Sequence, residues 1–188
     1  MLMDRIVKAL TFKKEVYADV EQDKSFTTTA WILVIVVSIV AALGNLSFAQ
    51  FGKSLLGVLV AAILNVVGFA VAALVINLVG RALFKADVTF EELVRTIGLA
   101  YVWNAANIIG ILGGVLSCIL WPVRIVAWVG LAVSWFLAVK EALDLEWVPT
   151  IVTVVLGWLV IVLVQVLTGV ILAALGIAGA AVAGALGG

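Results

Sequence analysis

The side chains best suited to chemistry in this sequence are amides that stand inside long apolar stretches. They are Asn65, Asn77, Asn104, Asn107 and Gln165. Polar groups at membrane depth often serve a function, but uncharged amides also form hydrogen bonds between neighbouring helices. Asn104 and Asn107 are three residues apart and face a similar direction on a helix. We therefore interpret the amides as contacts between helices, with a substrate site as the alternative.

Three tryptophans recur every seven residues, at Trp121, Trp128 and Trp135. This spacing places them on one face of a helix. Because tryptophan is enriched at membrane interfaces, such a stripe is typical of helix packing or lipid contact. The alternative interpretation is a flat hydrophobic surface for a pigment, a quinone or a partner helix.

Small residues form two series at intervals of four. The series consist of Gly110 and Gly114, and of Gly176, Ala180, Gly184 and Gly188. Small side chains at this spacing let two helices approach each other closely. We expect both series to pack within the protein's own bundle or against another subunit.

The chain lacks the residue sets of common catalytic and metal sites. It has no histidine and a single cysteine, Cys118, which excludes imidazole ligands and internal disulfides. Residues 47–54 end in Gly-Lys-Ser, as a phosphate-binding loop does, but Ser47 replaces the first glycine and the segment joins two apolar stretches. No paired carboxylates or nucleophile–base set is present. We therefore predict no catalytic residue, no cofactor and no metal.

The overall composition indicates a membrane protein. Of the 188 residues, 66% are hydrophobic and 12% are charged, and the mean hydropathy is +1.34. A soluble domain of this length could not bury so much apolar surface in one core. The net charge of zero gives no indication of nucleic-acid binding.

Five apolar stretches are long enough to cross a bilayer as helices, which takes about 20 residues each. Their approximate ranges are 28–46, 55–79, 93–112, 118–139 and 148–167. Thr89 and Glu92 form a capping-box pattern before the third stretch. The fold class is therefore predicted as an all-α polytopic membrane bundle of five transmembrane helices. A sixth crossing after residue 167 is the alternative.

We divide the chain into an amphipathic and polar N-terminal segment (1–26), a five-helix membrane domain (27–175) and a Gly/Ala-rich apolar tail (176–188). In the first part, apolar residues at positions 2, 3, 6, 7 and 10 have helical spacing. They predict a short amphipathic helix that lies on the inner membrane face or packs under the bundle.

Basic residues predict the orientation in the membrane. Five crossings would leave only Lys53 and Arg124, of eleven basic residues, on the side opposite the N-terminus. Since cytoplasmic loops are enriched in lysine and arginine, we predict a multi-pass protein of the cell membrane with a cytoplasmic N-terminus and an external C-terminus.

Short motifs are distributed along almost the whole chain. They are Asp4-Arg5-Ile6, Tyr17, Asp23, Thr89-Phe90-Glu91-Glu92-Leu93, Gly98-Leu99-Ala100-Tyr101, Trp135 and Lys140-Glu141-Ala142-Leu143-Asp144-Leu145. This layout resembles the Yip family, the Ypt/Rab-interacting-protein membrane domain, in its bacterial branch. Trp103-Asn104 stand where the family usually has a proline, and the Asp-Leu-Tyr-Gly-Pro-type motif of eukaryotic relatives has no counterpart. The resemblance implies five spans, a cytoplasmic N-terminus and no enzyme activity, and we do not carry over Rab binding.

These patterns favour a non-catalytic membrane protein that organises or scaffolds other membrane components, or that serves as an accessory subunit of a membrane complex. The alternative is a small transporter or channel, in which the intramembrane asparagines would line a path. The expected partners are membrane lipids and other membrane-protein subunits or a second copy of the chain. No nucleic-acid partner is expected.

Overall fold

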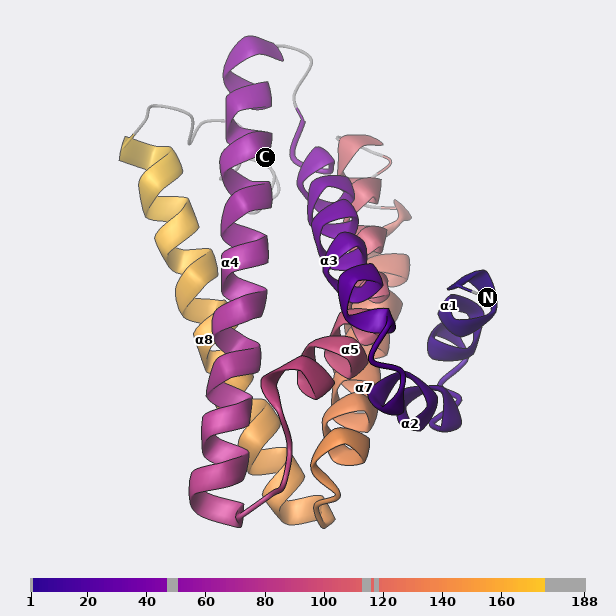
Figure 1. Cartoon of the computed structure of the whole chain (residues 1–188). Coiled ribbons are helices and arrows are strands. Elements are labelled where there is room, and N and C mark those ends of the chain that lie inside the picture. Colours follow the sequence, from indigo (N-terminus) through magenta and orange to yellow (C-terminus); the bar gives the residue numbers. More distant parts are fainter. Residues whose placement is uncertain (1, 47–50, 113–115, 117–118, 175–188) are drawn as a thin grey trace.

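Long helices packed side by side form the body of the molecule, two running in one direction along it and two in the other (Figure 1). The computed structural model describes residues 2–46, 51–112, 116 and 119–174. The long helices are α3 (Phe26–Leu43), α4 (Phe51–Phe84), α7 (Trp121–Leu143) and α8 (Trp147–Ala174). Each of these four helices is long and apolar enough to cross a membrane. The prediction of an all-α membrane bundle is thus confirmed for the described residues.

The third predicted span, 93–112, is not a single α-helix. α5 (Phe90–Ala100) is followed directly by η2 (Tyr101–Leu112), a 3-10 helix. At the start of α5, the hydroxyl of Thr89 accepts from the backbone N–H of Glu92 at 3.3 Å, and the Glu92 carboxylate accepts from the Thr89 N–H at 2.7 Å. The predicted capping box is therefore confirmed, whereas the four single helices account for only four of the five predicted crossings.

Two glycines bring the end of α3 and η2 into direct backbone contact. A Cβ atom on Gly44 would overlap the carbonyl oxygen of Asn107, and one on Gly110 would lie 2.5 Å from the carbonyl oxygen of Gly44. A 3-10 helix is narrower than an α-helix, which suits this close approach. Gly110 thus packs inside the bundle. The other small residues of the predicted series, Gly114, Gly176, Ala180, Gly184 and Gly188, lie outside the described residues.

Two short helices precede the bundle and lie beside it, α1 (Leu2–Leu10) and α2 (Glu15–Gln22) (Figure 1). α2 packs on α5 and α7, and three of its side chains are fully buried, namely Val16, Tyr17 and Val20. α1 buries Ala9 and leaves four large apolar residues exposed, namely Leu2, Met3, Val7 and Leu10. After α1, the ring of Phe12 stacks on Trp103 of η2 with 5.5 Å between centroids.

Arg95 fastens α2 to α5, and among the described charged residues it is the one that is buried, with 3% of its surface exposed. Its Nε donates to the carbonyl oxygens of Val20 at 3.0 Å and Glu21 at 2.9 Å, and its Nη1 donates to the hydroxyl of Thr27 at 3.1 Å. The last carbonyls of a helix have no partner within it, and a cation suits that end of the helix dipole. Arg95 therefore caps α2.

Arg95 lies inside the third predicted span, 93–112, and in the structure it occupies the second turn of α5, where α2 covers it. Its charge is accommodated there because α2 folds back and offers carbonyl oxygens to the guanidinium.

Two carboxyl groups near the end of α2 have pKa values that are shifted in opposite directions. Asp23 accepts from the Ser25 hydroxyl at 2.5 Å and pairs with Arg5 at 2.8 Å, and these contacts lower the pKa of Asp23. Burial raises the pKa of Glu21 above its ordinary value of 4.5, and the nearby carboxylates Asp144, Glu92 and Glu141 raise it further, while Arg95 opposes them.

Replacing Arg95 with methionine should loosen α2. The variant leaves carbonyl oxygens buried without a donor, and each such group costs about 1–3 kcal/mol. We therefore expect the backbone amides of residues 15–22 to exchange with deuterium about tenfold faster or more. Hydrogen exchange followed by mass spectrometry measures this rate, and the exposed Arg81→Met is the matched control. Unchanged exchange in Arg95→Met would show that Arg95 does not hold α2.

Replacing Glu21 with glutamine should stabilise the docking of α2 on α5. A carboxyl group whose pKa is raised on folding destabilises the folded state as the pH rises through that pKa. We therefore expect slower exchange in α2 than in the wild type at pH 7, and no difference well below pH 4.5. Glu15→Gln, at the exposed start of α2, is the control. An equal effect of Glu21→Gln at both pH values would contradict the electrostatic explanation.

Alanine at Gly44 should destabilise the bundle, because its Cβ would overlap the Asn107 carbonyl group. Overpacking of this kind costs about 1–3 kcal/mol, which corresponds to a loss of several degrees in Tm in detergent. Gly169→Ala provides the control, since a Cβ there has nothing within 4 Å. An equal Tm for Gly44→Ala and Gly169→Ala would show that the close contact between Gly44 and Asn107 does not contribute to stability.

Candidate functional site

A cavity of about 100 Å³ lies between α4, η2, α7 and α8. Its polar lining comes from the side-chain amides of Asn65, Asn104 and Gln165. Its aromatic lining consists of Phe69, Tyr101, Trp128, Trp135 and Trp158. None of the described lining residues is Asp, Glu, Lys or Arg. Because Asn65 lies near the middle of α4, the cavity is at mid-depth in the bundle.

Glycines on α4 and α8 hold the two helices close enough to shape this cavity. A Cβ atom on Gly157 would lie 2.7 Å from the side chain of Ile76, and one on Gly68 would lie 3.0 Å from Val164. Gly68 itself lines the cavity, so its missing side chain leaves room there. At the same level, Nε2 of Gln165 donates to Oδ1 of Asn65 at 3.3 Å.

Aromatic rings hold one another in fixed positions around the cavity. Phe69 is 1% exposed, and its ring meets those of Tyr101 at 5.3 Å and Trp135 at 6.3 Å in edge-to-face contacts. Trp128 on α7 and Trp158 on α8 meet in the same way at 5.2 Å. Edge-to-face pairs of this kind contribute about 0.5–1.5 kcal/mol each beyond area burial. These contacts therefore stabilise the arrangement of the aromatic side chains around the cavity.

Two polar groups beside the cavity differ in their hydrogen bonding. Trp135 is 1% exposed, and its indole N–H has no hydrogen-bond partner among the described residues. Oδ1 of Asn104 accepts from Nδ2 of Asn107 at 2.7 Å. A buried donor without a partner costs about 1–3 kcal/mol, so the Trp135 N–H is a local cost of packing this ring in the core.

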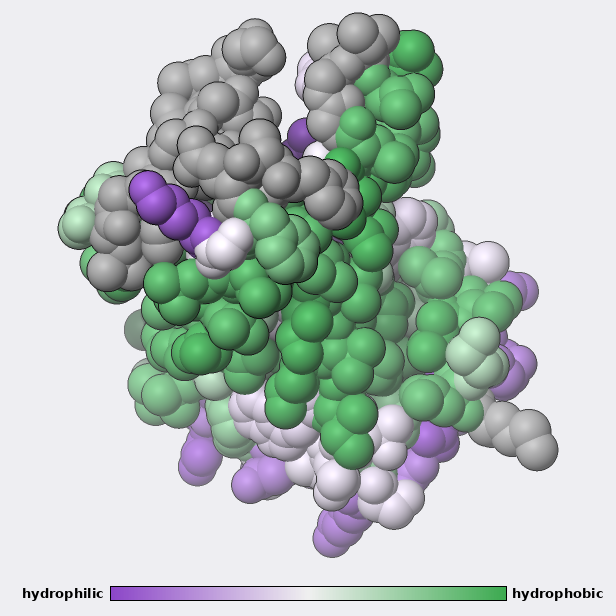
Figure 2. Space-filling view, turned by 90° about the horizontal axis from the view of Figure 1, so that it is seen from above, coloured by the Kyte–Doolittle hydropathy of each residue, from purple (hydrophilic) through white to green (hydrophobic). Residues whose placement is uncertain are grey.

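The cavity reaches the outer surface of the bundle between α7 and α8. Three of its lining residues are exposed, namely Trp128 at 64%, Val162 at 57% and Gln165. Seen from above, hydrophobic residues cover most of the described surface, and most hydrophilic residues lie toward the lower and right-hand edges of the view (Figure 2). Because large apolar side chains such as Val129 on α7 and Leu159 on α8 are also exposed, these helix faces suit lipid, and a molecule dissolved in the bilayer could enter there.

The structure brings together five of the residues singled out by the sequence. Asn65, Asn104, Gln165, Trp128 and Trp135 all line the cavity, although they come from four different helices. The bond between Asn65 and Gln165 joins two helices, α4 and α8. The even spacing of the tryptophans gave no indication that Trp135 is buried while Trp128 is exposed.

The remaining predicted residues lie elsewhere. Nδ2 of Asn77 donates to the carbonyl oxygen of Val88 at 3.3 Å and so holds the loop before α5. Asn107 bonds to Asn104 within η2 rather than to another helix, because residues three apart align on a 3-10 helix. Trp121 is exposed at the start of α7 and is not part of the cavity lining.

Sequence reasoning missed three aromatic members of the site, Phe69, Tyr101 and Trp158. None of them belongs to a repeat, and each is surrounded by other apolar residues in the chain. The signal that could have found Phe69 is its position four residues after Asn65, on the same helix face. Among the described residues, no group of three or more His, Cys, Asp or Glu could hold a metal ion.

A family model, the Yip1 domain, matches residues 7–169. No curated protein and no solved structure matches the chain. The match begins in α1 and ends in α8, so it includes every helix that lines the cavity, and it confirms the resemblance to the Yip family. The family consists of membrane proteins and is not known for enzyme activity. With its long apolar helices, this chain is a multi-pass membrane protein that belongs to the Yip1 domain family.

Proposed function

We propose that this chain is a non-catalytic protein that holds another component of the membrane in the cavity between α4, η2, α7 and α8. In doing so it organises that component or acts as an accessory subunit. The observation that carries the proposal is a cavity between four helices whose described lining combines amides with aromatic rings and includes no charged side chain. Such a lining suits recognition of a neutral molecule in a lipid environment.

A transporter or channel would need a polar path along the bundle. Between the cavity and the Arg81 end of α4, fully buried apolar side chains fill the described core, among them Ile76, Leu93, Ile97 and Val139. This packing supports a recess that opens to one side rather than a conduit, and it makes the transporter the weaker alternative.

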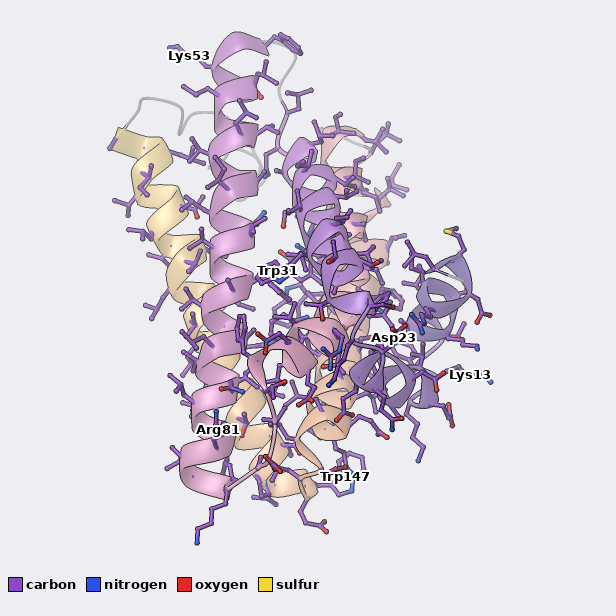
Figure 3. All side chains as sticks on the ribbon, in the orientation of Figure 1. Lys13, Asp23, Trp31, Lys53, Arg81 and Trp147 are labelled. Atoms are coloured by element: carbon purple, nitrogen blue, oxygen red, sulfur yellow. The ribbon has the colours of Figure 1, made fainter. Side chains whose placement is uncertain are left out.

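The same proposal includes five membrane crossings with a cytoplasmic N-terminus in the cell membrane. η2 alone rises about 24 Å at about 2 Å per residue, so α5 and η2 together are long enough to complete the third crossing. Figure 3 places Lys53 at one end of α4 and Arg81 at the other, close to the end where Trp147 begins α8. The loops before and after α4 therefore lie at opposite ends of the bundle, and the loops before α5 and before α8 lie at the same end. This arrangement supports the predicted orientation.

The N-terminal segment fits a position at the cytoplasmic membrane surface. α1 exposes Met3 and Val7, and Lys13 follows it beside the bundle (Figure 3). Apolar residues that face outward next to basic residues suit the boundary between lipid chains and anionic headgroups. We propose that α1 lies in this boundary while α2 stays docked on α5.

Replacing Trp128 with alanine should release the bound component. We expect wild-type protein, extracted from its native membrane in a lipid-preserving polymer, to carry one additional component in a fixed ratio. Native mass spectrometry measures that ratio, which should fall severalfold in Trp128→Ala because one aromatic wall of the cavity is lost.

Trp121→Ala is the matched control for this experiment. Trp121 lies on the same helix and is exposed to a similar extent as Trp128, 63% against 64%, but it does not line the cavity. The variant should keep the component. Wild-type protein that carries nothing, or an equal loss in both variants, would contradict the proposed function.

A further inference from the structure

We propose that the N-terminal segment, residues 9–22, regulates the cavity by docking on the outside of the wall that η2 and α7 form there. Docking of the segment and binding of a component in the cavity then stabilise each other. The inference rests on the proposed function and describes how the same site is regulated. It follows from two contacts on this wall, from the residues beside them and from the balance of forces that holds the segment.

The first contact joins Phe12 to η2. The rings of Phe12 and Trp103 stack with 5.5 Å between their centroids and 11° between their planes. Trp103 also packs on α7, since a Cβ atom on Gly130 would lie 2.6 Å from the indole ring. The absence of a side chain at Gly130 thus lets the Trp103 ring lie directly on the backbone of α7. Phe12 therefore packs on a ring that connects the two elements of the wall.

The second contact joins Tyr17 of α2 to α7. Tyr17 is fully buried, and α2 packs on α7. Burial raises the pKa of Tyr17, and the hydroxyl group of Ser134 on α7 opposes this rise, which shows that the two hydroxyl groups are neighbours. Neither of them forms a hydrogen bond with a described residue, so each adds a cost to the docked state.

The residues beside these two contacts line the cavity. They are Tyr101 and Asn104 around Trp103, Leu131 after Gly130 and Trp135 after Ser134. The segment and the cavity therefore share the same stretches of η2 and α7. Because protein interiors are close-packed, a shift of these stretches on release of the segment also changes the shape of the cavity.

The link between α1 and α2 is strained in the docked state. Phe12 has a φ of 58°, a left-handed conformation that is unfavourable for residues other than glycine. It ends α1 in the arrangement that glycine usually adopts there, in which the N–H of Lys13 donates to the carbonyl oxygen of Lys8 at 2.9 Å. The stack on Trp103 offsets part of this cost, and loss of the stack would release the strain.

Opposing contacts also act at the other end of the segment. Arg95 donates to the last carbonyl oxygens of α2 and so favours docking. The Glu21 carboxylate opposes docking, because it is partly buried and is repelled by other carboxylates, namely those of Glu92 on α5 and of Glu141 and Asp144 at the end of α7. A docked state held by such a balance shifts toward release after a small change in free energy, such as the loss of a component from the cavity.

Replacing Phe12 with alanine should weaken binding in a cavity that Phe12 does not line. The probe is the component that wild-type protein retains on extraction in a lipid-preserving polymer. Native mass spectrometry at increasing dilution gives its apparent Kd, which we expect to rise about fivefold or more in Phe12→Ala. Phe12→Tyr keeps the ring and should retain the wild-type Kd. Met3→Ala is the matched control, since Met3 is an apolar residue of α1 that is 70% exposed.

The reverse effect can be measured on wild-type protein, because coupling between two sites is reciprocal. Hydrogen exchange of residues 13–22 is compared between protein that retains the component and protein from which detergent has removed it. We expect exchange to be about fivefold faster or more after removal. Trp128→Ala should exchange like the stripped protein, and Trp121→Ala like the untreated wild type. A segment with a purely structural role would exchange at one rate in all four samples.

Two results would overturn the inference: an equal Kd in Phe12→Ala and Met3→Ala, or exchange in α2 that stays the same after the component is removed. In both cases wild-type protein still carries a component, so the proposed function stands. If Phe12→Ala does not fold, the exchange measurement on wild-type protein decides alone. Wild-type protein that carries nothing contradicts the proposed function and this inference together.

Discussion

The buried guanidinium of Arg95 is the contact on which the arrangement at the N-terminal end of the bundle depends. It gives α2 the donors that the last turn of a helix lacks, and it allows Val16, Tyr17 and Val20 to be buried against α5 and α7. With α2 in place, Phe12 reaches Trp103 at the start of η2. A short polar segment is thereby connected to the helix that lines the cavity.

A second constraint acts through glycine. Gly44 and Gly110 bring the backbones of α3 and η2 together, while Gly68 and Gly157 do the same for α4 and α8. Lipid tails are as apolar as leucine, so close packing rather than a hydrophobic driving force holds helices together in a membrane. The two sets of contacts fix η2 and α8 on opposite sides of the cavity. Gly68 itself lines the cavity, and a Cβ there would press on Val164 of α8.

The sequence predicts most of the fold, since the stretches 28–46, 55–79, 118–139 and 148–167 each correspond to one long helix. It does not predict η2, because residues 101–112 contain no proline or other local signal for a 3-10 helix. The structure adds a tertiary contact that the sequence does not reveal, the close backbone approach of η2 to Gly44. The site was predictable in its residue types, through Asn65, Trp128 and Gln165, but not in its assembly. Periodicity describes one helix, whereas the cavity is formed by four.

The treatment of polar groups elsewhere in the bundle argues that the cavity is a site rather than a packing defect. Thr150, Thr153 and Thr168 of α8 each bond to a backbone carbonyl oxygen four residues earlier, and Asn77 bonds to Val88. In the cavity, by contrast, the amides of Asn65, Asn104 and Gln165 come from three helices, although an apolar side chain at these positions would avoid the cost of placing an amide in a membrane. Amides from three helices that gather around one opening are what a binding site for a neutral ligand requires.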